Sequence, residues 1–351
     1  MNIVILIVVV AIGVLFLGVL VGVGLLQCYL AKYQYQSPFY WRQVPYLSNI
    51  VFVVGHNKLL RLVSGALKVF SVADFNAKQW CVGLCSIVSF FRLQTIMERL
   101  DDRLDTSLPQ DILALGDATL GPQLSPFLNR FLSPRDVQDL NYFVMKGLIT
   151  SPELYSFWNL LAFKAHRQAL LTLEYNEEPC VEKKALIREK MAQENLEIAG
   201  CCCAIFVHFV RKDSRIGEII SDNKGHGLTY DDLKKVYPSP ARSGELMQVL
   251  HDTLEFRLDL REERTIGKIS ANYFLARLEK QGDYDAIQNS ITPLPNRVVN
   301  FYELPEAVRK VFVTVQDEYI REVFHLGLLS GWINTLWWEY NYRVGFYLEK
   351  K

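Results

Sequence analysis

Uncharged, strongly apolar residues fill the first part of the chain. No charged side chain occurs before Lys32, and residues 3–26 are almost all Ile, Val, Leu, Phe, Ala or Gly. As a helix rising about 1.5 Å per residue, this run would be roughly 36 Å long, enough to cross a bilayer with some tilt. The pattern predicts a single transmembrane helix, the anchor, in residues 1–31.

A cleaved signal peptide is the alternative to a retained anchor. Such a peptide has a basic start, a shorter apolar core and a small-residue cleavage site. Here only Met1 and Asn2 precede the apolar run, and the run is too long. Gln27 also stands where a lipoprotein-type cleavage site before Cys28 needs a small residue. We therefore expect a retained anchor.

The residues after the anchor indicate its orientation. Every charged residue between Cys28 and Val72 is basic, and aromatic residues crowd positions 29–46. Basic residues near a membrane helix stay in the cytoplasm, and aromatic rings favour the headgroup level. The sequence therefore predicts a single-pass protein of the plasma membrane or a bacterial inner membrane. Its N-terminus is expected outside, and its body in the cytoplasm.

Two features of this region predict contacts with lipid or with another helix. Gly18 and Gly22 form a G-x-x-x-G step, which lets two helices approach closely in lipid, although glycine is also common in membrane helices generally. Lys58, Arg61 and Lys68 form the polar side of an amphipathic helix. Such a helix beside an anchor lies on the membrane surface or, alternatively, packs on the protein's own core.

Helical periodicity dominates the remainder, and convincing alternating strands are scarce. Residues 80–104 predict a helix that is buried or, alternatively, partly inserted in the membrane. Prolines and glycines mark residues 105–132 as a linker. We expect an all-α protein in four parts: the anchor (1–31), a juxtamembrane aromatic and basic segment with amphipathic helices (32–104), the linker (105–132) and an α-helical cytoplasmic domain (133–351).

Capping signals and apolar spacing place the helices of the cytoplasmic domain. Ser133 and Ser151 each precede a proline, which the first turn of a helix tolerates, and both serines are expected N-caps. Apolar spacing is clearest from Val308 to Phe324, in a helix expected to continue toward Trp338. The other predicted helices cover residues 151–175, 182–210, 230–236, 244–263 and 266–281, and the best strand candidate is 297–302.

Composition and charge narrow the choice of partners. The 351 residues include 38 Lys and Arg and 38 Asp and Glu, so the formal net charge is zero. Because nucleic-acid binding needs a basic excess, no nucleic-acid partner is expected. The seven cysteines are odd in number and irregularly spaced. This argues against a disulfide framework or a zinc ribbon and fits reduced thiols in the cytoplasm.

One stretch resembles an EF-hand calcium loop in outline. Residues 222–233 begin with Asp222 and have a glycine at the sixth position. Lys224 and Leu233, however, stand where oxygen ligands belong. We expect a polar turn capped by Thr229, and no specific calcium binding.

Two further patterns have simpler interpretations than the sites they resemble. Glu318, Glu322 and His325 share one helix face with the spacing of a di-iron site, but a second Glu-x-x-His is missing. The three thiols at 201–203 point in different directions on a helix and are expected to pack as small apolar residues, with lipidation as the alternative. Nucleotide-binding and hydrolase motifs are absent from the sequence. No cofactor and no metal are expected.

The end of the chain is its most aromatic part. Trp332, Trp337 and Trp338 belong to a group of rings that spread around the helix axis beyond Gly331, so one core cannot bury them all. They are expected to form a docking surface, with core closure or the membrane interface as alternatives.

Together these features predict a membrane-anchored helical interaction protein, a subunit or docking platform of a membrane complex. Its expected partners are membrane lipids and other proteins of the complex, or a second copy that associates through the anchor. The alternative is a membrane-bound enzyme that acts on a lipid or another membrane-borne substrate, with Glu318, Glu322 and His325 as its candidate site.

Overall fold

Helices account for the regular structure of the part of the chain that can be described. The computed structural model describes residues 69–85, 107–113, 133–145, 149–222, 227–267, 269–282 and 304–328, together with positions 96, 103, 147, 330–332, 334 and 335. Among these residues there are helices and no strands, which confirms the all-α prediction for this part of the chain. The helices are α4 (Ala77–Cys85), α6 (Pro109–Leu113), α8 (Pro134–Met145), α9 (Ser151–Glu177), α10 (Val181–Arg211), α11 (Ser214–Asp222), α12 (Tyr230–Val236), α13 (Pro238–Ile266), α14 (Tyr273–Lys280) and α16 (Glu306–His325).

None of these described helices is both long and apolar enough to cross a membrane. The predicted anchor (1–31) lies outside the described residues, as does most of the predicted amphipathic helix that contains Lys58, Arg61 and Lys68. The strand candidate at 297–302 lies outside them as well.

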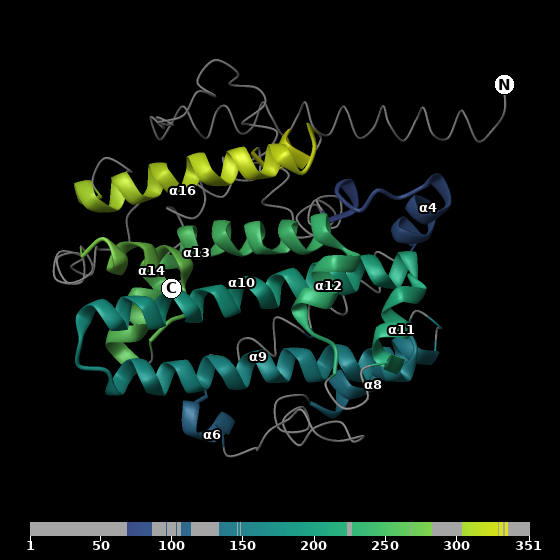
Figure 1. Ribbon diagram of the computed structural model, residues 1–351, viewed down its shortest axis with the longest axis horizontal. Helices are drawn as coiled ribbons and strands as arrows, with labels where there is room; N and C mark the ends of the chain where they lie inside the picture. The colour runs from purple at the N-terminus through teal and green to yellow at the C-terminus, as the bar shows by residue number, and fades with distance from the viewer. Residues whose placement is uncertain are drawn as a thin grey trace, which may run out of the picture.

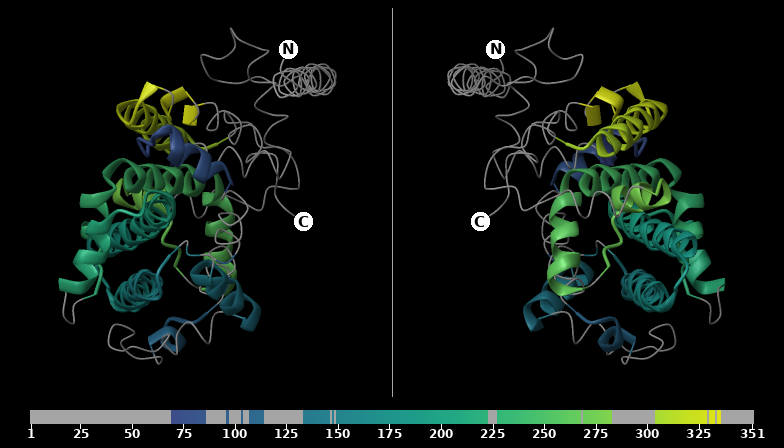
Figure 2. Two further views of the ribbon diagram at one scale, coloured as in Figure 1. Left: turned by 90° about the vertical axis from the view of Figure 1, so that its right-hand side faces the viewer. Right: turned by 90° about the vertical axis from the view of Figure 1, so that its left-hand side faces the viewer.

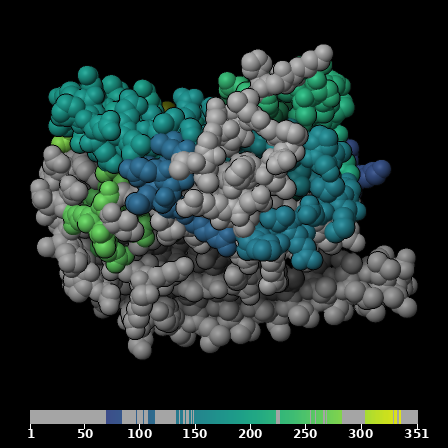
Figure 3. Space-filling model, turned by 90° about the horizontal axis from the view of Figure 1, so that it is seen from below, coloured from purple at the N-terminus to yellow at the C-terminus, as the bar shows by residue number. Residues whose placement is uncertain are grey.

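The long helix α10 lies at the centre of a stack. It packs along α9 on one side and along α13 on the other, and α16 lies on the far side of α13 (Figure 1). End-on views show α9 and α16 at opposite ends of this stack (Figure 2). Seen from below, α6, α8 and α9 contribute much of the described surface (Figure 3). Since α9 and α10 are joined by residues 178–180 alone, they form an antiparallel hairpin.

Two large apolar clusters, with a small third one between α9 and α10, hold the stack together. The larger one fills the space among α9, α10 and α12 and includes the buried side chains of Phe157 and Trp158. The other joins α13, α14 and α16, where the ring of Phe274 lies 4.8 Å from that of Phe256 and 6.3 Å from that of Phe312, measured between centroids. Burial of such apolar area is the main force that stabilises the fold.

Small residues let α10 and α13 approach closely. A Cβ atom added to Gly244 would lie 2.3 Å from the carbonyl oxygen of Ala199. A Cβ atom added to Gly200 would lie 2.6 Å from the hydroxyl oxygen of Tyr230. Both distances are far below van der Waals contact. Tyr230 belongs to α12, and the nearest atom of α13 to a Cβ on Gly200 is the carbonyl oxygen of Ala241 at 3.0 Å, so the crossing of α10 and α13 requires glycine above all at position 244.

A buried arginine joins four helices at the other end of the stack. Arg188 of α10 is fully buried and forms ion pairs with Glu263 of α13 and with Glu279 of α14, the latter at 3.1 Å. Tyr175 of α9 donates a hydrogen bond to Glu279 at 2.7 Å. Buried charges need such partners, because removing one of them leaves the other uncompensated away from water.

Capping residues explain where several helices begin. Ser133 and Asp136 exchange the hydrogen bonds of a capping box, as do Thr229 and Asp232 at α12. Both starts confirm the sequence interpretation. At α9 the N-cap is Thr150, in a capping box with Glu153, so the prediction of Ser151 was wrong by one residue.

Other predicted boundaries were less accurate. Helix α13 begins at Pro238, six residues before the predicted start, because prolines are tolerated in a first helical turn. Helix α16 ends at His325 and does not continue unbroken toward Trp338, because Gly327 adopts a φ of 140°. Part of the predicted linker (105–132) forms α6, which packs on α9.

Candidate functional site

Most of the predicted interaction residues lie outside the described residues. This holds for Gly18 and Gly22 in the anchor, for the basic residues of the surface helix, and for two of the three predicted tryptophans. The basic residues are Lys58, Arg61 and Lys68, and the two tryptophans are Trp337 and Trp338. Trp332 is described and is 44% exposed.

Trp332 belongs to an exposed apolar group that we call the α16 patch: Phe324, Leu328 and Trp332. Their exposed fractions are 37%, 70% and 44%. The rings of Phe324 and Trp332 meet edge to face, with their centroids 6.3 Å apart. The patch therefore presents two packed aromatic rings and a leucine at the surface, a combination common at protein interfaces.

The chain beyond α16 folds back to support this patch. Gly327 breaks the helix, and the hydroxyl of Tyr319 then donates to Oδ1 of Asn334 at 3.2 Å. A Cβ atom on Gly331 would lie 2.3 Å from the ring of Phe324, so only glycine allows the ring this position. Tyr319 and Asn334 are buried, which fixes the exposed rings on a packed base.

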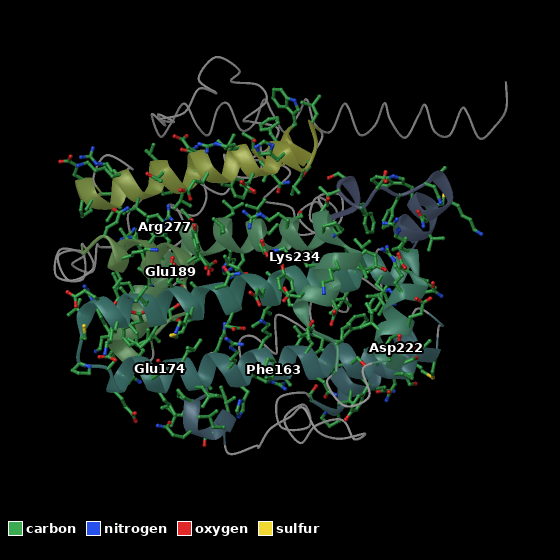
Figure 4. The ribbon with its side chains drawn as sticks, in the orientation of Figure 1. Phe163, Glu174, Glu189, Asp222, Lys234 and Arg277 are labelled. Carbon is green, nitrogen blue, oxygen red and sulfur yellow. The ribbon has the colours of Figure 1, made fainter. Side chains whose placement is uncertain are left out.

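The two glutamates of the triplet Glu318, Glu322 and His325 are paired with arginines. Glu318 pairs with Arg277 of α14 at 2.8 Å, and Glu322 pairs with Arg242 of α13 at 3.1 Å. Arg277 lies between α14 and α16 (Figure 4). Among the described residues, no group of three His, Cys, Asp or Glu side chains is arranged to hold a metal ion. These glutamates thus tie α16 to its neighbours.

The remaining predicted patterns have structural roles in the described part. Leu233 and Thr229 of the calcium-like loop serve as a core residue and a helix cap, while positions 223–226 lie outside the described residues. Cys201 and Cys203 are buried in the larger apolar cluster, as expected for packing residues. Burial raises the pKa of the Cys201 thiol well above its ordinary value.

A cavity that the sequence did not predict lies between α9 and α10. Its volume is about 510 Å³, and the segment that leads into α12 closes one side. We call it the α9–α10 cavity. Its walls contain apolar side chains such as Phe163, which lies midway along α9 (Figure 4), and charged side chains from both helices. Pockets of roughly 300–1,000 Å³ are typical of small-molecule sites.

A buried lysine organises the polar wall of this cavity. Lys164 donates to Glu194 at 2.7 Å and also to Glu197, and the second oxygen of Glu194 lies 2.8 Å from Nε of Arg167. Burial lowers the pKa of Lys164, but its hydrogen bonds to the two glutamates outweigh burial, so the pKa is raised. Lys164 therefore stays protonated and positively charged near neutral pH.

A second polar cluster joins the start of α9 to the end of α10. His208 is buried, with Nδ1 2.9 Å from the hydroxyl oxygen of Tyr237 and Nε2 3.2 Å from Oε1 of Glu153. Burial lowers the pKa of His208 despite the neighbouring carboxylate. Because Glu153 also caps α9, this cluster serves to connect elements of the fold.

One signal in the sequence would have pointed to the cavity. Helices 151–175 and 182–210 were predicted as consecutive elements, and a short connection makes such helices antiparallel neighbours. Their facing positions carry Lys164 and Arg167 on one helix and Glu194 and Glu197 on the other. Pairing these charges across the hairpin would have brought them together.

Comparison with known proteins gives no family to which the chain can be assigned. Neither the protein-family models, nor the curated proteins, nor the solved structures contain a match to this chain. Any function proposed for the chain therefore rests on its sequence and on the geometry of its sites.

Proposed function

We propose that this chain is a membrane-anchored helical interaction protein that docks another protein of a membrane complex on the α16 patch. The exposed pair of Phe324 and Trp332 with Leu328 is the observation that carries the proposal. Large apolar side chains on a packed base are the usual anchors of a protein interface.

Several features of the chain support this proposal. The undescribed Trp337 and Trp338 follow the patch closely in the sequence and would extend it. The uncharged run in residues 1–31 would hold the patch near a membrane, where Gly18 and Gly22 offer a second contact for a partner helix. Lys58, Arg61 and Lys68 would contribute contacts with lipid headgroups.

The enzyme alternative has less support from the described residues. Its candidate carboxylates, Glu318 and Glu322, are already engaged by Arg277 and Arg242. We therefore retain the interaction function as the single proposal.

The test compares complexes extracted from native membranes. Leu328→Ser with Trp332→Ala, and separately Trp337→Ala with Trp338→Ala, should release the partner, because interface anchors commonly contribute about 2 kcal/mol each, roughly thirtyfold in affinity. The size of the extracted complex is measured by native electrophoresis. The matched control is Leu170→Ser with Leu186→Ser, two exposed leucines on α9 and α10. It should leave the complex intact.

Thermal melting of each variant separates docking from folding. We expect every variant to melt at the wild-type temperature. The complex should be lost only in the variants of the α16 patch and of Trp337 and Trp338. If these variants lose their cooperative melt, the rings are part of the core. If both fold and complex persist, the α16 patch is not a docking surface.

A further inference from the structure

The α9–α10 cavity is large enough for a small organic molecule and is not used by the proposed docking function. Side chains of both helices point into the space between them (Figure 4). Leu160 and Phe163 on α9 and Leu228 before α12 supply apolar wall. Phe163 is a partly exposed ring, which provides a flat apolar face for a ligand.

The cavity is lined by three basic side chains and three acidic ones, so the formal charges cancel: Lys164, Arg167 and Lys190, and Glu194, Glu197 and Asp231. Lys164 bonds to Glu194 and Glu197, and Glu197 also accepts a hydrogen bond from Gln193 at 3.1 Å. Lys164 and Glu194 are both more than nine-tenths buried. This network fixes the two helices relative to each other and leaves little attraction for a cationic ligand.

Two basic side chains on the same cavity retain capacity for an anion. Arg167 contacts Glu194 through Nε, yet its side chain is 54% exposed and a guanidinium carries five donors. Lys190 is exposed on α10, and among the described residues no carboxylate lies within ion-pair distance of it. Glu194 follows Lys190 by four residues on α10, a spacing at which ion pairs form, but Glu194 is paired with Lys164 and Arg167 instead.

An unsatisfied acceptor lies on the same face of α9. Oδ1 of Asn159 is buried and accepts no hydrogen bond from the described residues. Asn159 precedes Arg167 by eight residues, about 12 Å along a helix. Buried polar atoms are nearly always hydrogen bonded, and Asn159 lines the cavity, so this oxygen can accept from a donor on a ligand once the side chain turns toward the cavity.

From these observations we propose that the α9–α10 cavity binds a small organic anion with an apolar, preferably aromatic, body. Its carboxylate is bound by Arg167 and Lys190, its ring packs on Phe163, and a donor on the ring reaches Asn159. The proposal is independent of the α16 patch, which lies on a different helix.

The test uses the full-length chain in lipid nanodiscs and two matched probes, a hydroxylated naphthalene carboxylate and its neutral carboxamide. Titration calorimetry, with empty nanodiscs as the blank, should show one saturable site for the carboxylate. The carboxamide should bind about tenfold more weakly or worse, because charge-assisted hydrogen bonds to the carboxylate are lost. Equal affinity for the two probes would show that the cavity does not select anions.

Variants locate the binding. Arg167→Gln with Lys190→Gln should weaken carboxylate binding by about tenfold or more, and Lys190→Glu alone should weaken it as well. The matched control, Arg261→Gln with Lys310→Gln, removes the same charges from outside the cavity and should leave the affinity unchanged. All of these side chains are at least partly exposed, so the variants should fold. No saturable binding to the wild-type chain, or unchanged affinity in the folded cavity variants, would overturn the proposal.

Discussion

At the scale of single residues, burial decides the charge state of His208. The imidazole lies between Glu153 of α9 and Tyr237 before α13, with Asp213 and Lys212 just beyond the end of α10. Desolvation lowers its pKa more than the two acidic neighbours raise it. His208 is therefore neutral in the folded protein at a pH where the unfolded chain already binds a proton.

This difference predicts a stability that falls with acidification. The folded pKa of His208 lies below the ordinary 6.5, so its contribution is complete above pH 6.5 and is lost as the pH falls further. Burial raises the pKa of Glu153, but hydrogen bonds from Thr150 and the charge of His208 outweigh it, so a second loss begins below the ordinary 4.5. These two groups therefore lower the melting temperature in two stages as the pH falls, against an opposite contribution from Asp259, whose pKa is raised to about 7 by burial and by Asp252.

The matched variants are His208→Gln and His166→Gln, the latter on α9. We expect His208→Gln to flatten the decrease between about pH 7 and pH 5, and His166→Gln to retain the wild-type slope. A wild-type slope in His208→Gln would mean that other groups cause the pH dependence.

At the scale of helices, local signals predicted the starts of α8, α9, α10, α12 and α16 to within two residues and missed those of α6, α11, α13 and α14. The start of α12 was predicted from four residues alone, because Thr229 and Asp232 have the spacing of a capping box. Helix α13 was predicted too short because Pro238 and the residues after it look like a loop, although the first turn of a helix accepts them. The break at Gly327 was missed because a glycine inside an apolar pattern does not reveal its φ angle.

The crossing of α10 and α13 gives a prediction in which packing and helix propensity oppose each other. Propensity alone favours alanine over glycine inside a helix by roughly 0.5–1 kcal/mol. At Gly244 the added Cβ would meet backbone atoms of Ala199 and Gly200 at 2.3–2.8 Å. Such overpacking costs typically about 1–3 kcal/mol, and here the neighbouring atoms belong to backbone that moves little.

Gly244→Ala should therefore lower the melting temperature of the chain. Gly217→Ala is the matched control, because Gly217 lies in α11 with no atom within 4 Å of its added Cβ and should leave stability unchanged or raise it. If Gly244→Ala melts at or above the wild-type temperature, the close approach of α10 and α13 is not a stabilising contact.

At the scale of the whole molecule, the sequence predicted an all-α body but not its cavity. The cavity walls come from residues 159–167, 190–197 and 227–231, which become neighbours only through the α9–α10 hairpin and the path into α12. Along each helix these charges look like an ordinary solvated face. The α16 patch was predicted in part, through Trp332, because a dense group of aromatic residues is visible without knowledge of the fold.

Membrane orientation is the prediction that concerns the whole chain. The basic, acid-free sequence after the uncharged run predicts that the helical body lies in the cytoplasm. Protease added to intact cells or spheroplasts should leave the chain beyond Lys32 uncut, and permeabilised samples should be digested. Digestion of the body in intact samples would contradict this orientation.

The most direct test of the central claim is site-specific photocrosslinking in native membranes. A photoreactive phenylalanine replaces Trp332 in the α16 patch, or Leu186 on α10 as a similarly exposed control. We predict that position 332 forms one crosslinked product of defined mass with a partner protein, and that position 186 forms none. No product at position 332, or the same products at both positions, would contradict docking on the α16 patch.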